Sequence, residues 1–386
     1  MTVVGIFLNN EMRTGANRRY LELMEGLAQL GNDVFVIMNA RLEYAPKAFK
    51  RIDLDVKYRR KGFPPASYLF ARAIKRSMGQ VLAAIGDKAS PGKCWIHIHG
   101  DMHLRSATVL KKRLRASLFF AFRCNDVKRA HLLRESGHLN PVETAMSFVH
   151  ESLNRLRERQ VASRAELVTF QNASDRDEFL ARTRYPAGKT VIIPGNIGMP
   201  RFSDDDRDKN ASVRLRRLIY VGTLSVSKGL QYVLEAFAEL VKRGHKDLSL
   251  TVLGKINGDE PAFRLAAELG IREKVRFEGF RLPFPYFAET DLMVYPTLYD
   301  AFPDTILEAL HVGCPVMASS VGGIPDLLSH EELLFAASDV RDIADKIERC
   351  VNDDSYYMKI KALCAARAES FRFDWPKKFD ECMKGF

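Results

Sequence analysis

Two carboxylates, Asp300 and Glu308, stand eight residues apart near the C-terminus, on either side of the start of a predicted helix. The helix is expected to end at Gly313, and a buried-type strand over 315–319 then runs into the turn Gly322–Gly323. Open α/β sheets bind ligands at the carboxyl ends of their strands, where this segment would lie. Carboxylates accept hydrogen bonds from sugar-type hydroxyls, and a helix N-terminus offers unpaired N–H groups to a diphosphate. The segment therefore predicts a site that can bind both kinds of group.

Lys228 is the leading cationic candidate. It follows a predicted strand over 217–221, lies in a short loop between Gly222 and Gly229, and opens a helix. A cation at a helix N-terminus opposes the helix dipole, which is reasonable if an anion binds there. The alternative is an ordinary solvated lysine, and we favour the anion-binding interpretation.

The helix after Asp300 can contribute backbone donors. Asp304 is expected to be the N-cap of a helix over 305–312, which leaves the N–H groups of Thr305 and Ile306 free to face phosphate. An acid beside an anion is unfavourable, so Asp304 as a plain cap is an equally good interpretation. Glu308 is either an exposed helix acid or a half-buried acid that needs a partner, and its core-type neighbours favour burial.

Three histidines, His97, His99 and His103, cluster with Asp101 at the end of a strand predicted over 94–99. We expect His97 and His99 to point to opposite faces of that strand. On that expectation the cluster does not form a closed ligand set, and no metal site is predicted.

The elements that position these residues alternate between strand and helix patterns, which predicts parallel, doubly wound sheets. At 386 residues, with 46% hydrophobic and 28% charged residues, two soluble domains are expected. The predicted strands are 2–8, 33–38, 94–99, 118–123, 167–171, 191–194, 217–221, 248–253, 275–277 and 292–295, and the clearest helices are 17–30, 229–243, 261–269, 341–351 and 355–370.

The charge is unevenly distributed. Residues 1–200 carry 33 Lys and Arg against 18 Asp and Glu, a net +15, whereas the remainder carries −4 of the total +11. Basic residues interleave with aromatic ones over 57–76, and 105–115 forms a second basic segment. An anionic membrane surface and a solvated basic face explain these segments equally well, and nucleic acid is not expected because no recognised motif accompanies the charge. Scattered cysteines and the absence of a leader or spanning run in the sequence predict a cytoplasmic protein, and the basic segments leave open a peripheral location at the cytoplasmic face of the membrane.

The motifs occur in an order that resembles the retaining glycosyltransferases of the GT-B fold, family 4 (group 1). The similar segments are Thr14-Gly15-Ala16, Ile193-Pro194-Gly195-Asn196, Tyr220-Val221-Gly222-Thr223 with Lys228-Gly229, and Asp300-x7-Glu308 followed by Gly313-Cys314-Pro315-Val316 and Gly322-Gly323. The resemblance implies two Rossmann-like doubly wound domains that face each other across a cleft. It also implies a metal-independent enzyme, without cofactor, that moves a hexose-type sugar from an NDP-sugar to a glycan, lipid-linked or small-molecule acceptor.

The resemblance also implies roles for individual residues. The catalytic set is Lys228, Asp300 and Glu308, and Glu308 would hold the ribose while Asp300 grips donor-sugar hydroxyls. The donor-binding set is Gly15, Gly222, Thr223, Lys228, Phe280, Arg281, Asp300, Phe302, Thr305, Ile306 and Glu308. The acceptor-side set is His99, Asp101, Asn125 and Asp126.

Three positions depart from the family pattern. Asp300 stands where Glu is usual, Thr223 where Arg is usual, and Asn125 where many members have His, so a catalytic histidine role is not transferred. Candidates for the missing second cation are Arg13, Arg18, Lys255 and Arg281.

The expected boundaries are an acceptor-binding domain over 1–198, a linker over 199–214 and a donor-binding domain over 215–370. A helix over 371–386, which contains Trp375, would cross back to the first domain. Two rival functions stay open: a same-fold epimerase or phosphorylase-like enzyme, and a non-catalytic basic binding protein on a degenerate transferase scaffold.

Overall fold

The structure is a computed structural model that describes residues 1–10, 15–58, 64–89, 92–137, 139–196, 212–256 and 261–386. Most of the expected linker therefore lies outside the described residues. The chain forms two compact units. The first comprises Met1–Asn125, Ser152–Pro194 and Asp374–Phe386, and the second comprises Asp126–Glu151 and Gly195–Phe373. Residues 126–151 thus group with the second unit, although no feature of the sequence predicts a break at Asn125.

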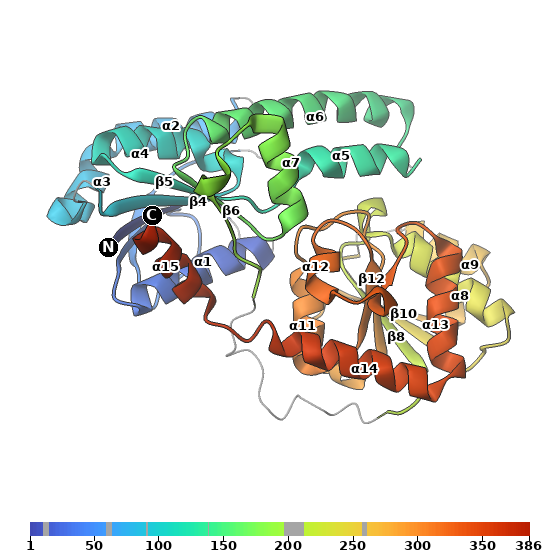
Figure 1. The fold of residues 1–386 in the computed structure, drawn as a ribbon. Helices are drawn as coiled ribbons and strands as arrows, with labels where there is room; N and C mark the ends of the chain where they lie inside the picture. Colours follow the sequence, from blue (N-terminus) through green and yellow to red (C-terminus); the bar gives the residue numbers. More distant parts are fainter. Residues whose placement is uncertain (11–14, 59–63, 90–91, 138, 197–211, 257–260) are drawn as a thin grey trace. The chain divides into compact units, whose positions relative to one another are not determined.

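The first unit is built on a seven-stranded sheet in which every neighbouring pair is parallel (Figure 1). The strand order is β3-β2-β1-β4-β5-β6-β7, so the sheet grows outward in both directions from β1. The strands are β1 (Thr2–Phe7), β2 (Asp33–Asn39), β3 (Lys50–Leu54), β4 (Cys94–His99), β5 (Ser117–Ala121), β6 (Leu167–Phe170) and β7 (Thr190–Ile192).

Helices cover both faces of this sheet, because alternate strand residues are apolar on each side. On one face, Phe70 of α2 (Ala66–Arg76) and Leu110 of α4 (Leu104–Leu114) share a core with Ile6 and Ile96. On the other face, α1 and α15 pack on the sheet and on each other. The helices of this unit are α1 (Gly15–Gln29), α2 (Ala66–Arg76), α3 (Met78–Ile85), α4 (Leu104–Leu114), α7 (Ala173–Thr183), α15 (Trp375–Gly385) and the C-terminal part of α6 (Pro141–Ala162).

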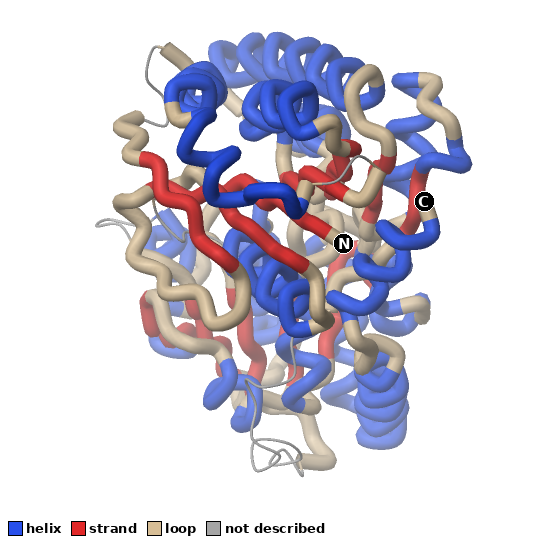
Figure 2. The backbone as a smooth tube through the Cα atoms, turned by 90° about the vertical axis from the view of Figure 1, so that its left-hand side faces the viewer, coloured by secondary structure: helices blue, strands red, loops and turns tan. Residues whose placement is uncertain are grey.

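The second unit contains a six-stranded parallel sheet in the order β10-β9-β8-β11-β12-β13. Figure 2 shows the strands of the protein lying between layers of helix. The strands are β8 (Arg217–Val221), β9 (Ser249–Leu253), β10 (Val275–Gly279), β11 (Leu292–Tyr295), β12 (Val316–Ser319) and β13 (Leu334–Phe335). The helices are α5 (Asp126–Glu135), α8 (Leu230–Lys242), α9 (Pro261–Glu268), α10 (Phe284–Glu289), α11 (Asp304–Val312), α12 (Ile324–Leu328), α13 (Val340–Asn352) and α14 (Asp354–Glu369).

The C-terminal helix α15 belongs to the first unit. A Cβ on Gly26 of α1 would lie 2.2 Å from the ring of Pro376, so the two helices are in close contact there. Asn32 donates a hydrogen bond to Asp380 at 2.8 Å, and Trp95 packs edge-on against Phe386. The two parallel sheets with helices confirm the predicted α/β fold class.

Candidate functional site

A half-buried cation and an acid meet at the carboxyl ends of β8 and β11, in the second unit. Lys228 Nζ donates to Asp300 Oδ2 at 2.7 Å and to the Tyr295 hydroxyl at 3.2 Å. Tyr295 in turn donates to the same Asp300 oxygen at 3.0 Å. The Lys228 side chain is only 28% exposed, so its charge is held in a partly desolvated position. The structure brings together Lys228 and Asp300, and adds Tyr295, which the sequence analysis did not propose as a site residue.

Two glycines fix the backbone around this cluster. Gly229, between Lys228 and α8, has φ +72°, and a Cβ there would lie 2.1 Å from the carbonyl oxygen of Pro296. Gly322 has φ +58°, and a Cβ there would lie 2.0 Å from the carbonyl oxygen of Asp300. Only glycine fits such a left-handed turn against backbone. The loop that carries Asp300 is therefore in contact with a glycine turn on each side.

The electrostatics keep the lysine charged and the tyrosine neutral. Burial alone would lower the pKa of Lys228, but Tyr295 and Asp300 outweigh it, and the pKa lies above its ordinary value. Burial, with Asp300 adding to it, raises the pKa of Tyr295. A neutral phenol can donate to the carboxylate while it accepts from the ammonium, which matches the observed geometry.

The start of α11 differs from the prediction in one respect. The helix begins at Asp304, and Pro303 occupies the cap position without a side-chain cap bond, so the expectation that Asp304 is the N-cap was wrong. Proline can precede the first turn because its missing N–H is not needed there. Asp300 Oδ1 instead accepts from the N–H of Phe302 at 3.2 Å, which fixes the carboxylate just before the helix.

Glu308 lies on α11 and is 7% exposed, among buried Ile306, Leu307, Ala309 and Leu310. Thr305 is half-buried in the first turn of the same helix, and Phe302 is buried. Glu308 makes a polar interaction, so it is a satisfied buried acid rather than an exposed helix residue.

The remaining donor-side candidates lie at the ends of β8, β9 and β10. The N–H of Gly222 donates to Leu253 at 3.0 Å, and the Thr223 carbonyl accepts from the Tyr220 hydroxyl at 2.9 Å. Phe280 follows β10 and is 80% exposed, and Arg281 beside it is exposed as well. Lys255 is exposed after β9.

Three candidates come from the first unit or lie outside the described residues. Gly15 begins α1, and Arg18 is half-buried on the same helix. Arg13 lies outside the described residues. Gly15 and Arg18 belong to a different compact unit from the Lys228 cluster.

The histidines near the end of β4 do not have the arrangement that we expected. Residues two apart on a strand share a face, so the expectation that His97 and His99 oppose each other was wrong. Both rings stack on Tyr20, with centroids 5.4 and 4.3 Å from its ring. Burial lowers the pKa of His97 to about 3 and that of His103 to about 4, and lowers that of His99 as well. His97 and His99 are therefore neutral rings of an aromatic cluster around Tyr20, whereas His103 is a neutral ring that stacks on Phe70 in the core on the opposite face of the sheet.

The other acceptor-side candidates are separated by their environments. Asp101 is half-exposed and accepts from Arg157 at 3.1 Å, and Asp126, at the start of α5, pairs with Arg129 at 2.8 Å. Asn125 is fully buried. Of these three, only the two acids reach the surface.

Asn125 is part of a polar network that the sequence did not predict. Its amide donates to Glu178 at 2.8 Å and to Asp175 at 3.2 Å, and its oxygen accepts from Arg182 at 3.1 Å. Arg182 also binds both oxygens of Glu158, at 2.7 and 2.9 Å. The environment of Asn125 therefore fits a structural role, and its assignment to the acceptor side stays a prediction.

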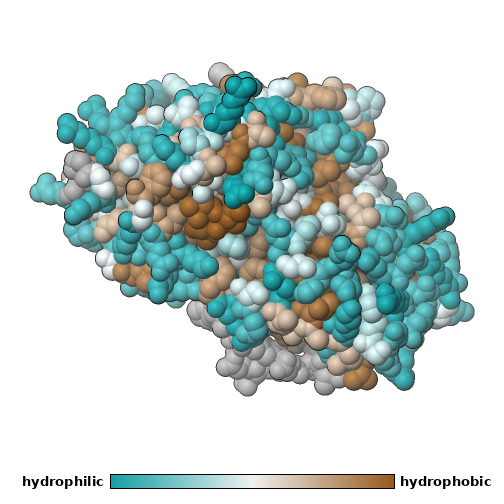
Figure 3. All heavy atoms as spheres, viewed as in Figure 1, coloured by the Kyte–Doolittle hydropathy of each residue, from teal (hydrophilic) through white to brown (hydrophobic). Residues whose placement is uncertain are grey.

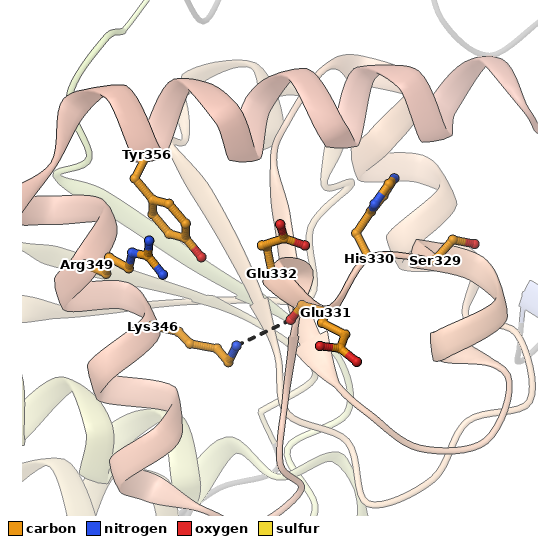
Figure 4. A pocket seen from close by; sticks show the side chains of 7 residues that line it. All are labelled: Ser329, His330, Glu331, Glu332, Lys346, Arg349 and Tyr356. Carbon is orange, nitrogen blue, oxygen red and sulfur yellow. Dashed lines mark hydrogen bonds between the residues drawn. The ribbon is translucent and has the colours of Figure 1, made fainter.

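A pocket of about 390 Å³, separate from the Lys228 cluster, lies elsewhere in the second unit and is drawn in Figure 4. Lys346 donates to the backbone oxygen of Glu331 at 3.3 Å, and Arg349 stacks on Tyr356 at 3.8 Å. Its lining is Ser329, His330, Glu331, Glu332, Lys346, Arg349 and Tyr356, which includes none of the predicted site residues. Cations and acids are mixed in this lining, so its charge does not select one class of ligand.

Neither a metal-binding cluster nor a membrane-spanning helix is found among the described residues. Within those ranges, no group of three or more His, Cys, Asp or Glu side chains is placed to hold a metal ion. Likewise, no helix in the described part of the chain is both long and apolar enough to cross a membrane.

Two models of known protein families match this chain, one in each of its two parts. The model for "Glycosyl transferases group 1" matches residues 202–363, and the model for "Glycosyl transferase 4-like domain" matches residues 14–196. The protein belongs to the group 1 glycosyltransferases. Together the two family models match residues of both compact units, so the similarity to the family extends along nearly the whole chain.

Curated relatives of this glycosyltransferase are distant. An alpha-D-kanosaminyltransferase of Streptomyces kanamyceticus is 25% identical over 224 residues, which cover 54% of this chain and 57% of that one. A D-inositol 3-phosphate glycosyltransferase of Corynebacterium aurimucosum is 26% identical over 271 residues, 62% of this chain and 64% of that one. The matches thus span about three fifths of these relatives.

Solved structures show the same fold. Sucrose-phosphate synthase from Thermosynechococcus elongatus has a TM-score of 0.75 at 19% identity, and covers 100% of this chain and 99% of that one. WaaG, a glycosyltransferase involved in lipopolysaccharide biosynthesis, has a TM-score of 0.73 at 17% sequence identity, and the match covers 100% of both chains. HepE of Anabaena, solved in complex with UDP, has a TM-score of 0.72 at 16% sequence identity, and the match again covers 100% of both chains. The group 1 glycosyltransferase therefore has the GT-B fold.

Proposed function

We propose that the protein is a retaining, metal-independent glycosyltransferase that moves a hexose-type sugar from an NDP-sugar to a glycan, lipid-linked or small-molecule acceptor. The observation that carries the proposal is the Lys228 ammonium, held at the carboxyl ends of β8 and β11 against Asp300. A cation fixed in a partly desolvated site stabilises a developing negative charge more strongly than it would in water. Complexes of HepE with UDP and UDP-glucose support a nucleotide sugar as the donor class.

The reaction breaks the bond between the anomeric carbon and the diphosphate oxygen and forms a bond from that carbon to an acceptor hydroxyl oxygen. The diphosphate leaves with the bonding electron pair, and the proton of the acceptor hydroxyl passes to a leaving phosphate oxygen. In this proposal, Lys228 leaves Asp300 for the leaving diphosphate and compensates its charge. The N–H groups in the first turn of α11 also stabilise the negative charge of the leaving diphosphate.

The two acids have different tasks in this proposal. Asp300, fixed by Tyr295 and by the N–H of Phe302, accepts hydrogen bonds from donor-sugar hydroxyls once Lys228 turns to the phosphate. Glu308, deeper on α11, accepts from the ribose hydroxyls. The exposed ring of Phe280 is available to stack on the base.

A panel of nucleotide sugars tests the proposal. We expect slow release of free nucleotide and free sugar from one NDP-hexose among UDP-, GDP-, ADP- and dTDP-linked donors, because water can replace the missing acceptor. An isomerised sugar would favour the epimerase instead. If no nucleotide or nucleotide sugar raises the melting temperature, the non-catalytic binding protein is the better account.

We also propose that the basic surface of the first unit faces an anionic membrane surface near a lipid-linked acceptor. Lys112, Arg113 and Arg115 at the end of α4, and Lys75 and Arg76 at the end of α2, are exposed cations that support this. Co-sedimentation with anionic vesicles should be strong at low salt and weak at high salt. Binding that ignores lipid charge would contradict this part of the proposal.

Tyr295 provides a test of the cluster itself. We expect Tyr295→Phe to lower turnover about tenfold, since it removes the hydroxyl that bridges Lys228 and Asp300, a hydrogen bond to charged groups of about 1.5 kcal/mol. Tyr295 is a positioning residue, so the loss should appear in kcat more than in the KM for the donor. Tyr286→Phe, which removes a half-buried hydroxyl bonded to Glu278, is the matched control. Equal effects of the two substitutions would contradict the role of Tyr295.

A further inference from the structure

The long helix α6 is inverted, with polar residues facing the protein and apolar residues facing outward. On its inner side, Glu151 pairs with Arg134 and Glu158 pairs with Arg182. Of the fifteen large hydrophobic residues that are exposed in the described part of the chain, six lie on this one helix. Five of them, which we call the α6 stripe, are 45–71% exposed: Val142, Met146, Val149, Leu153 and Leu156.

The spacing of the α6 stripe is that of a helix-pairing seam. Its residues follow one another at intervals of four, three, four and three, which is the heptad pattern that buries one apolar seam against another helix. In Figure 3, brown and pale-brown atoms show among teal ones at the upper right, where Figure 1 places α6. An apolar stripe of this length on a surface helix marks an interaction site.

We propose that the α6 stripe is a homodimer interface in which α6 pairs antiparallel with α6 of a second copy across a two-fold axis. In a two-fold interface, if residue i contacts the partner's residue j, then j contacts the partner's i. When the α6 stripe packs antiparallel against the α6 stripe of the second copy, Leu153 contacts the partner's Val149 and Met146 contacts the partner's Leu156.

The flanking charges select this arrangement. The antiparallel register sets Glu143 beside the partner's Arg157, and the two-fold axis repeats that pair. A parallel register would instead set Arg157 beside the partner's Ser152, with no opposite charge. Arg157 is bound to Asp101 within the chain, but this pair is about half exposed, so little free energy is lost if Arg157 turns away.

The size of the seam predicts a weak dimer. Two helices packed along some fifteen residues bury on the order of 1,000 Å², the lower limit for a specific interface. We therefore expect a dissociation constant of about 1–100 µM. This inference is independent of the proposed donor chemistry, because α6 carries no residue of the Lys228 cluster.

Sedimentation equilibrium of the full chain, from about 1 to 200 µM, tests it. The wild type should shift with concentration from the 43.8 kDa of one chain toward twice that mass. Leu153→Glu should weaken the dimer at least about thirtyfold, because it places two charges in the centre of an apolar seam. Met358→Glu, which makes the same kind of change at a 42% exposed site on α14, should leave the dimer intact. Unchanged melting temperatures would show that each variant is folded.

A charge exchange tests the register. Glu143→Arg and Arg157→Glu should each weaken the dimer about three- to tenfold, and the double variant should regain most of that loss. Glu143 also accepts from the N–H of Asn140 at the start of α6, at 3.0 Å, and the double variant does not restore this bond. Recovery of the dimer would therefore come from the pairing between copies.

Three results would overturn the proposal: a wild type that stays monomeric at 200 µM, a Leu153→Glu variant that dimerises as well as the wild type, or a double variant with no recovery. A monomer that co-sediments with vesicles of anionic lipid, and loses this binding on Leu153→Glu, would show that the stripe contacts a membrane instead.

Discussion

Lys228→Ala should lower turnover of the preferred NDP-sugar about 10²- to 10³-fold while the protein stays folded. The size of the effect is that of removing one fixed donor from a developing anion in a partly desolvated site. The fold should persist because Asp300 keeps its bonds to Tyr295 and to the N–H of Phe302. The measurement is nucleotide release under saturating donor, together with a melting curve.

The control for this substitution is Lys242→Ala, at the C-terminal end of α8, the helix that follows Lys228 and Gly229, where the side chain is exposed. Turnover of the control should match the wild type, because a solvated charge that far along α8 does not reach the site. If Lys228→Ala turned over donor as fast as Lys242→Ala, Lys228 would not face the leaving phosphate, and the proposed chemistry would lose its cation.

The first unit should lose stability steeply below pH 6.5. His97 and His103 are buried and neutral, with pKa values depressed by burial to about 3 for His97 and about 4 for His103, and the pKa of half-buried His99 is lowered as well. The unfolded chain, with histidine pKa values near 6.5, binds more protons below that pH, so acid favours unfolding. Between pH 7 and pH 5 each such histidine should lower the free energy of unfolding by about 2 kcal/mol, and the loss continues toward the folded-state values.

Tryptophan fluorescence isolates this effect. Both tryptophans, Trp95 and Trp375, lie in the first unit, so urea unfolding followed by their emission reports on that unit. His97→Phe should reduce the difference in unfolding free energy between pH 7 and pH 5 by about 2 kcal/mol. His131→Phe changes an exposed histidine on α5, in the second unit, so the stability that the tryptophans of the first unit report should match the wild type at both pH values. A pH dependence that was the same in both variants would contradict the buried, neutral state of His97.

The fold was predictable because its signals are local. Alternating strands and helices gave the two parallel sheets, and Gly222, Gly229 and Gly322 marked turns beside the strand ends. Lys228 and Asp300 were recognisable because each follows a strand end and carries a charge in a loop. Their direct contact was not predictable, since it depends on β8 and β11 being neighbours in the sheet.

The misses have physical causes. In the sequence, Tyr295 has the pattern of a buried strand residue. Only the arrangement of the strands in the sheet brings its hydroxyl to Lys228 and Asp300. The buried polar network around Asn125 was not predictable either, because its partners Asp175, Glu178 and Arg182 are 50 or more residues away in the chain. The inverted face of α6 was hidden for the same reason: a heptad pattern predicts a helix with one buried side, but not which side meets the protein.

Calorimetric titration of the wild type with UDP, GDP, ADP and dTDP tests the central claim most directly, because these products contain the diphosphate that Lys228 is proposed to bind. The account predicts that one of them binds in the micromolar range, with one site per chain, and that Lys228→Ala weakens it at least about tenfold. The account would be contradicted if none of the four bound, or if the wild type and Lys228→Ala bound the same nucleotide equally well.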